Sequence, residues 1–238
     1  DYIAVGKPRP DVLAAVGKGL QRGVEQANAT IVGGEVAIMP DLVTGLDLSG
    51  TCLGAVRMDG IITGQHCSPG DAIVGLPSSG VHSNGLTLAR KVIEKSGLDY
   101  RSRVKPLRKP IGEVLLTPTT VYVRQVLDIV RNFKVKGMVN ITGGGLRNFV
   151  RLKEGIGFCI EDPMEPNQIF KVIKSLGSIN DKEMYQTFNM GLGLAMIVPK
   201  KDAKAVTARA GRGAKVIGKV DDSGAVSVPS LGIEYSKY

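Results

Sequence analysis

The sequence predicts a soluble protein of the α/β type, in which strands and helices alternate along the chain. Hydrophobic residues make up 43% and charged residues 22% of the 238 residues, as in ordinary globular proteins. The 31 glycines are about twice the number expected from an average usage of roughly 7%, which predicts many tight turns. No apolar run approaches the roughly 20 residues that span a bilayer, so we expect no membrane partner.

The elements expected before residue 60 follow from hydrophobic periodicity and from turn residues. Apolar side chains follow Pro10 at a spacing near 3.6 residues and predict a helix. In order, we expect a strand end at 2–5, this helix over 10–24, a short strand at 31–32 that ends at Gly33 and Gly34, a buried strand over 46–56 and a hairpin turn at 59–60.

Strands and helices are expected to continue in alternation beyond that turn. Thr117 followed by Pro118 predicts a helix start, because a capping residue there precedes proline at the first helical position. The full order is a strand at 72–76, a helix at 86–95, a polar loop over 98–112, the helix from 118, a strand at 139–141, a helix from 146, a helix at 166–176, a strand at 191–198, an Ala-rich helix and a strand at 215–220. We place a domain boundary near residue 60, which divides the chain into residues 1–60 and 61–238.

The net charge of +9 suits either nucleic acid or anionic small molecules. Lysines and arginines are spread along the chain in doublets such as Arg108-Lys109, and no basic segment carries the aromatic residues typical of RNA-binding motifs. We therefore expect no nucleic-acid partner. The three cysteines form no CxxC pair, which argues against a disulfide framework or a zinc site and favours a reducing, cytoplasmic location.

A glycine-rich segment follows the strand expected at 139–141. Thr142, Gly143, Gly144 and Gly145 precede an expected helix. Glycines let backbone N–H groups turn toward a bound group, and a helix N-terminus favours negative charge, so this pattern is typical of a phosphate site. No Gly-Lys-Ser/Thr follows, so the segment is not a Walker loop. The alternative is a tight turn between strand and helix.

A second polar loop covers residues 77–85 and precedes the helix at 86–95. It contains three serines, His82 and Asn84, which offer five donors or acceptors within eight residues. Such a loop can bind a ligand or can simply cap the helix, with Ser83 or Asn84 at the N-cap. A serine hydrolase is disfavoured because the Gly-x-Ser-x-Gly motif is absent.

Two carboxylates lie near the first glycine pair. Glu35 follows Gly33 and Gly34, and Asp47 lies in the next expected strand. Mg²⁺ takes one or two carboxylates together with phosphate oxygens, so the pair is a candidate metal site. The alternative is that the two acids are unconnected.

Four segments occur in the same order as in one known family. They are Gly33 to Pro40 (GGEVAIMP), Leu76 to Gly85 (LPSSGVHSNG), Ile141 to Gly145 (ITGGG) and Glu183 to Gly191 (EMYQTFNMG). This set resembles the phosphoribosylformylglycinamidine cyclo-ligases, or aminoimidazole ribonucleotide synthetases, of purine biosynthesis. The similarity covers nearly the whole chain, and the second and fourth segments are specific to these enzymes among their ATP-using relatives.

The resemblance implies an α+β or α/β, two-domain aminoimidazole ribonucleotide synthetase-like fold. Residues 1–60 would be the remainder of an N-terminal, barrel-forming and dimer-forming ATP-binding domain, and residues 61–238 a complete C-terminal α/β domain. It implies ATP-dependent ring closure of formylglycinamidine ribonucleotide to aminoimidazole ribonucleotide, with release of ADP and phosphate. The implied cofactors are ATP and Mg²⁺, and the implied assembly of the full-length protein is a homodimer.

The resemblance also implies roles for individual residues. Glu35 and Asp47 match acidic residues near the metal, and His82 matches the polar loop that faces the cleft, where it would orient or protonate substrate. The expected ATP- or phosphate-binding residues are Thr142, Gly143, Gly144, Gly145, Ser83, Asn84, Gly85 and Asn189.

Four positions depart from the family pattern, namely Val36, Ile38, Thr120 and Asn140. Asn140 stands where the family usually has His, so it can form hydrogen bonds but cannot carry a proton. The resemblance further implies additional residues before Asp1, so we expect an N-terminally truncated chain that is inactive alone. The alternatives are a non-catalytic relative that binds a phosphorylated ligand and another ATP-using member of the superfamily.

Overall fold

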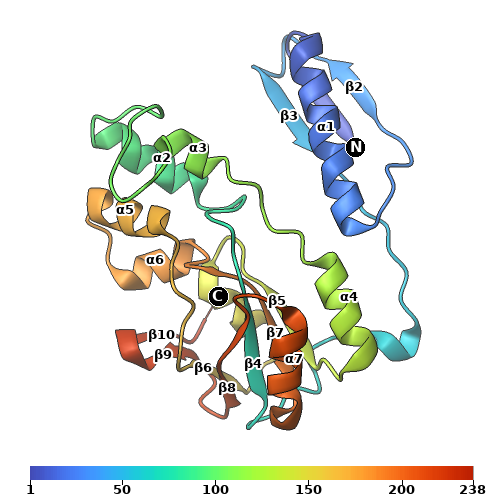
Figure 1. The fold of residues 1–238 in the computed structure, drawn as a ribbon, viewed down its shortest axis with the longest axis vertical. Helices are drawn as coiled ribbons and strands as arrows, with labels where there is room; N and C mark the ends of the chain where they lie inside the picture. Colours follow the sequence, from blue (N-terminus) through green and yellow to red (C-terminus); the bar gives the residue numbers. More distant parts are fainter. Residues whose placement is uncertain (238) are drawn as a thin grey trace. The chain divides into compact units, whose positions relative to one another are not determined.

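Residues 1–237 are described by a computed structural model, and they fold as two units (Figure 1). The first unit comprises Asp1–Ile61 and Val121–Arg124, and the second comprises Ile62–Thr120 and the residues from Gln125 onward. The first unit thus takes in a short segment that a division at residue 60 leaves in the second part. No helix among the described residues is long and apolar enough to cross a membrane.

The first unit is a three-stranded sheet with one long helix. Its elements are β1 (Tyr2–Val5), α1 (Pro10–Ala27), β2 (Glu35–Ile38), β3 (Leu46–Ser49) and a 3₁₀ turn (Met58–Gly60). The strand order is β2-β1-β3, with β1 parallel to β2 and antiparallel to β3. Helix α1 begins at Pro10 as expected, because proline suits the first helical position.

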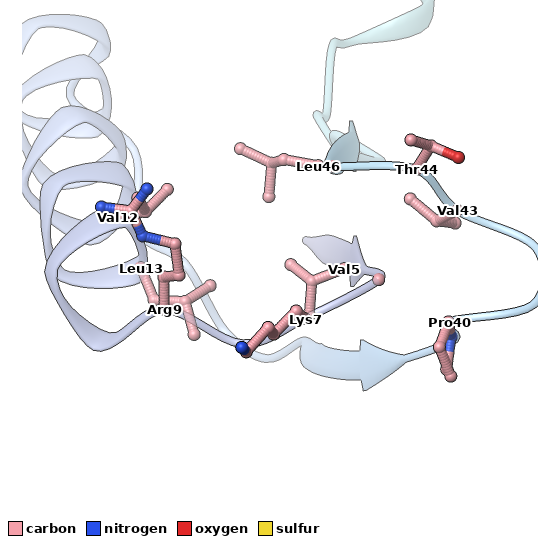
Figure 2. Close-up of a pocket in the computed structure, with 11 residues that line it drawn as sticks. Val5, Lys7, Arg9, Val12, Leu13, Pro40, Val43, Thr44 and Leu46 are labelled. Atoms are coloured by element: carbon pink, nitrogen blue, oxygen red, sulfur yellow. The ribbon is translucent and has the colours of Figure 1, made fainter.

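The packing of α1 on this sheet is open. Val5 and Leu46 of the sheet and Val12 and Leu13 of α1 line one cavity of about 490 Å³ (Figure 2). No residue of α1 is buried, although three of the four residues of the central strand β1 are.

Two strand predictions in the first unit are wrong. Residues 31–32 form no strand, and β2 begins instead at Glu35, after the glycine pair. The Asp1 backbone fills the space that a Cβ at Gly34 would need, so this glycine allows a close approach of two chain segments. The strand expected over 46–56 ends at Ser49 and is exposed, because β3 lies at the sheet edge and pairs only with β1.

The second unit is built on a seven-stranded sheet of order β10-β9-β6-β8-β4-β7-β5. Its strands are β4 (Ala72–Pro77), β5 (Gly137–Asn140), β6 (Gly157–Ile160), β7 (Leu192–Val198), β8 (Lys215–Asp221), β9 (Val226–Val228) and β10 (Ile233–Tyr235). Neighbouring strands run antiparallel except β6 and β9. The sheet is therefore of the α+β kind rather than a doubly wound parallel sheet.

Helices cover both faces of this sheet. The helices beyond residue 62 are α2 (Leu86–Lys95), α3 (Ile111–Leu115), α4 (Val123–Asn132), α5 (Gln168–Gly177), α6 (Asp181–Thr187) and α7 (Ala203–Ala210), and the first two residues of α4 belong to the first unit. Helices α2 and α3 pack against α5, and α7 packs against β4 and β8. Ile73 of β4 belongs to the core that includes α2 and α5, while its neighbour Ala72 lies beside α7, so the two helix layers take opposite faces.

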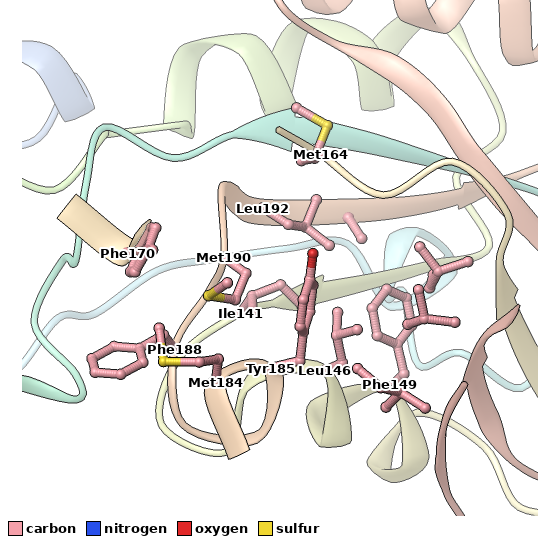
Figure 3. Packing of buried hydrophobic residues seen from close by; sticks show 14 of the residues in the cluster. Ile141, Leu146, Phe149, Met164, Phe170, Met184, Tyr185, Phe188, Met190 and Leu192 are labelled. Atoms are coloured by element: carbon pink, nitrogen blue, oxygen red, sulfur yellow. The ribbon is translucent and has the colours of Figure 1, made fainter. Parts of the chain in front are cut away.

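The main core lies on the α5 side of the sheet (Figure 3). Phe170 of α5 stacks at a tilt on Phe188, with 5.7 Å between ring centroids. Phe149 and Phe158 form a similar pair at 5.2 Å. All four rings are at most 1% exposed, so four of the five phenylalanines lie where they exclude water.

Three further predictions, for residues beyond 97, need correction. The helix expected from Pro118 begins at Val123, because residues 118–119 bond to the polar loop described below. The loop expected over 98–112 runs into α3. The helix after the glycine segment is a 3₁₀ helix, Gly145–Arg151, and not an α-helix.

Candidate functional site

A polar cavity of about 260 Å³ lies at one edge of the seven-stranded sheet. Strands β4 and β5 end at this edge and the antiparallel β7 begins there, because Pro77 pairs with Leu192 and Asn140 with Leu194. The cavity is lined by Val81, His82, Ser83, Asn84, Thr119, Asn140, Ile141, Thr142 and Asn189. The structure therefore gathers residues of three of the motifs found in the sequence, and none of the lining side chains carries a formal charge when His82 is neutral.

His82 sits in the polar loop with a left-handed backbone, at φ 63°. Its Nε2 accepts a hydrogen bond from the Ser79 backbone N–H at 3.1 Å. This bond needs an unprotonated Nε2. Ser79 Oγ also lies 3.1 Å from Nε2 and gives its own proton to Pro118, so that second contact needs a proton on Nε2. A neutral ring makes one of these two bonds in either tautomer. Burial lowers the pKa of His82 from its ordinary value of 6.5, which also favours the neutral ring.

Asn189 ties the polar loop to the start of β7. Its Oδ1 accepts from Ser78 Oγ at 2.8 Å and from the Gly191 N–H at 3.0 Å. Its Nδ2 donates to the carbonyl oxygens of Gly80 at 2.8 Å and Val81 at 3.2 Å. These bonds use both N–H groups and both lone pairs, so the amide positions the loop. Ligand binding by Asn189 stays a prediction.

The polar loop is also bonded to the segment before α4. Ser79 Oγ donates to the Pro118 carbonyl oxygen at 2.6 Å, and Ser83 Oγ lies 3.3 Å from Thr119 Oγ1. Sequence reasoning did not propose Thr119 as a site residue. The available signal is the Thr-Pro-Thr sequence at residues 117–119, whose pattern also predicts a helix start.

The glycine segment is packed on one side and adjoins the cavity on the other. Carbonyl oxygens of Tyr185 and Phe188 occupy the space that a Cβ of Gly145 would take. Asn148, which is 8% exposed, donates from Nδ2 to the carbonyl oxygen of Gly145 at 2.8 Å. Gly145 therefore serves close packing, whereas Thr142 faces the cavity.

The remaining predicted glycines also lie outside the cavity lining. A Cβ on Gly143 would lie 3.1 Å from Asn84 Oδ1, so this glycine sits directly beside the polar loop. Gly144 and Gly85 have positive φ angles of 98° and 82°, which favour glycine. The Phe188 ring fills the space beside Gly85, so Gly85 links the loop to the core.

Glu35 and Asp47 belong to the first unit. Glu35 pairs with Tyr2 and Asp47 with Ala4, so both carboxylates project from the same face on opposite sides of β1. Two strand spacings across the sheet and an offset of two residues along it put their Cα atoms about 12 Å apart. The described residues contain no group of three or more His, Cys, Asp or Glu side chains arranged to hold a metal ion.

Comparison with known proteins shows which family the chain resembles. Residues 1–56 match the N-terminal domain and residues 68–229 the C-terminal domain of the AIR synthase related proteins. The chain is 44% identical to the phosphoribosylformylglycinamidine cyclo-ligase of Methanopyrus kandleri and 46% identical to that of Methanosarcina acetivorans. Each match covers 98% of this chain and 69% of the relative.

The chain belongs to the phosphoribosylformylglycinamidine cyclo-ligase family.

Solved structures of other proteins have the same fold as this chain. The hydrogenase maturation protein HypE superimposes with a TM-score of 0.68 over 98% of this chain and 73% of its own, at 19% identity. Thermotoga maritima PurL, in complex with AMPPCP, superimposes with a TM-score of 0.57 over 99% of this chain and 36% of its own, at 15% identity. These matches bear out the aminoimidazole ribonucleotide synthetase-like fold expected from the sequence.

Proposed function

We propose that this protein carries out the ATP-dependent ring closure of formylglycinamidine ribonucleotide to aminoimidazole ribonucleotide, with release of ADP and phosphate. The observation that carries the proposal is the identity of 44–46% with cyclo-ligases over 98% of the chain. The polar cavity supports it, because residues from the motifs shared with that family line one pocket at the sheet edge. Ring closure needs a site that orients one nitrogen toward an activated amide carbon.

The cavity residues suit orientation by neutral hydrogen bonds. Ser83, Thr142 and Asn140 offer hydroxyl and amide groups that can each donate or accept. In the tautomer whose Nε2 accepts from the Ser79 N–H, His82 presents Nδ1–H to the substrate as a donor. In this proposal His82 orients the substrate, and it is not an imidazolium acid.

Metal binding is a separate part of the proposal. Glu35 and Asp47 are too far apart across β1 to form a compact pair, but each fits as a single carboxylate ligand whose other partners are phosphate oxygens. Mg²⁺ bound there with ATP would supply charge neutralisation for phosphoryl transfer. We also propose the homodimer and cytoplasmic location of the family. All three cysteines are free, which suits a reducing compartment.

The test is formation of aminoimidazole ribonucleotide by the purified intact protein, supplied with formylglycinamidine ribonucleotide, ATP and Mg²⁺. Product that requires ATP is the expected result. Thr142→Val should lower kcat/KM by at least about tenfold, because it removes a cavity hydroxyl and keeps the side-chain shape. Thr63→Val, at an exposed position, is the matched control.

Two results would contradict the proposal. One is the absence of product from well-folded intact protein. The other is an equal kcat/KM for Thr142→Val and the Thr63→Val control, which would mean that the cavity takes no part in the reaction. Tight nucleotide binding without turnover would favour a non-catalytic relative.

A further inference from the structure

A second cavity is lined by Ser79 and Gly80 of the polar loop, the two residues that precede those lining the first cavity. It has a volume of about 310 Å³, and its polar lining comes from Ser79 and Gly80 of the loop, Arg108 and Lys109, and Asn167 and Gln168 at the start of α5. The rest of its wall is apolar, formed by side chains such as Leu107, Val114 and Ile169. The two cavities thus share one loop, with successive residues of that loop lining each of them.

The second cavity is cationic, unlike the first. Arg108 and Lys109 are exposed, and neither forms an ion pair with any described residue. No acidic side chain lines this cavity in the described part of the chain. Two uncompensated positive charges at the mouth of a pocket create a local potential that favours an anion.

The start of α5 adds to this preference. Asn167 occupies the N-cap position, but its side chain does not cap the helix. Its Oδ1 lies instead 3.1 Å from Ser78 Oγ, on the polar loop. The first N–H groups of this ten-residue helix therefore have no side-chain acceptor and add partial positive charge to that of the two cations.

The size of the cavity limits the ligand. A volume of about 310 Å³ lies at the lower end of the roughly 300–1,000 Å³ typical of small-molecule sites. This is suited to a phosphate monoester with part of a sugar rather than to a whole nucleoside triphosphate. Arginine and lysine are the side chains that proteins use most for phosphate recognition.

We infer that this second cavity binds the phosphate monoester of the ribonucleotide substrate, an inference that rests on the proposed function. Ser79 connects the two sites physically, because its N–H bonds to His82 and its hydroxyl bonds to Pro118. A ribonucleotide anchored by its phosphate beside Ser79 and Gly80 lies along the loop whose next residues line the uncharged cavity. The charge of the substrate and its reacting amide are thereby recognised by successive residues of one loop.

The test is a double variant, Arg108→Gln with Lys109→Gln, in the intact protein. We expect the KM for formylglycinamidine ribonucleotide to rise at least about tenfold, with most of the change in KM rather than in kcat, because two charge-assisted contacts are lost. The KM for ATP should stay within about twofold. The control is Arg90→Gln with Lys91→Gln, which removes two exposed charges from α2.

Each result separates this inference from the proposed function. An unchanged substrate KM in the double variant overturns the inference, and so does a rise in the KM for ATP alone, which would assign the cavity to the nucleotide. If the unsubstituted protein shows no turnover, the proposed function fails, and calorimetry with ribose 5-phosphate then tests the cavity directly. Loss of ribose 5-phosphate binding in the Arg108/Lys109 variant, with binding retained in the Arg90/Lys91 control, supports the inference. Equal binding by the unsubstituted protein, the variant and the control overturns it.

Discussion

The two units of this protein differ in how completely their sheets are covered. In the second unit every residue of β7 is buried, because β4 and β5 flank it and helices pack on both faces. In the first unit every residue of β3 is exposed and α1 buries no side chain. The two strand sequences differ accordingly: β7 is Leu-Gly-Leu-Ala-Met-Ile-Val, without a polar side chain, whereas β3 alternates as Leu-Asp-Leu-Ser. The two leucines of β3 are nevertheless exposed, because nothing in the first unit covers them.

The sharpest test of this difference is truncation of one apolar side chain in each unit. Phe170→Ala should cost about 3–5 kcal/mol in the free energy of unfolding, because it empties a fully buried ring position. Leu20→Ala on α1 should cost less than about 1 kcal/mol. Denaturant unfolding of both variants measures the two changes in the free energy of unfolding. Equal costs would mean that α1 is covered in solution and that the contrast is wrong.

Ion pairs should show the same contrast. Lys136 Nζ lies 2.6 Å from Asp71 Oδ1, with side chains that are 15% and 7% exposed. Asp71→Ala should cost about 3 kcal/mol, because it leaves the ammonium group buried without its partner. Asp11→Ala breaks the Arg9 pair of the first unit, whose side chains are both 67% exposed, and should leave stability unchanged within error. A large loss from Asp11→Ala would contradict this interpretation.

The next largest loss of stability is expected from removing the buried side-chain amide of Asn189. Asn189→Ala should destabilise the protein by about 2 kcal/mol, because it removes the partners of Ser78, Gly80, Val81 and Gly191 together. Hydrogen exchange should then speed up in the polar loop. Asn132→Ala, at an exposed helix end, is the control. Protection that stays unchanged in the loop would show that Asn189 does not position it.

The smallest expected effect concerns pH and is confined to the second unit, which contains both histidines. The pKa of His82 is lowered by burial, so below pH 6.5 the unfolded chain binds more protons than the folded protein. The stabilisation from neutral His82 is therefore fully present above pH 6.5 and is lost as the pH falls toward the folded-state pKa. Unfolding measured from about pH 5 to 8 should show a shallower acid dependence for His82→Gln. An identical dependence would mean that His82 titrates alike in both states.

The predictions from sequence are right where an apolar segment also packs against a large core in the folded protein. The strand at 72–76 and the helix at 86–95 occur as β4 and α2, because both present an apolar face to a large core. The pattern failed at residues 46–56, where apolar residues lie on an edge strand and beyond it. It failed again at Thr117-Pro118, where the Ser79 hydroxyl donates to the Pro118 carbonyl oxygen, an acceptor that the first turn of a helix would have used.

Site prediction divides along a similar line. Side chains with chemistry of their own, such as His82 and Thr142, do line one cavity. The glycines are harder to interpret. A glycine can make room for a ligand or for the backbone of a neighbouring segment, and the sequence pattern is the same in both cases. At Gly145 the neighbour is the backbone of α6 and Phe188, and only coordinates could show that. The cationic cavity was missed because Arg108 and Asn167 are far apart in sequence and belong to no shared motif.

The absence of formal charge in the first cavity has a consequence for how salt acts on the protein. A chain with net charge +9 attracts an anionic substrate over long range, and dissolved ions weaken that attraction. Dipoles inside a pocket act only at contact and are little affected by ionic strength. Added potassium chloride should therefore slow capture of the substrate and leave the turnover of captured molecules nearly constant.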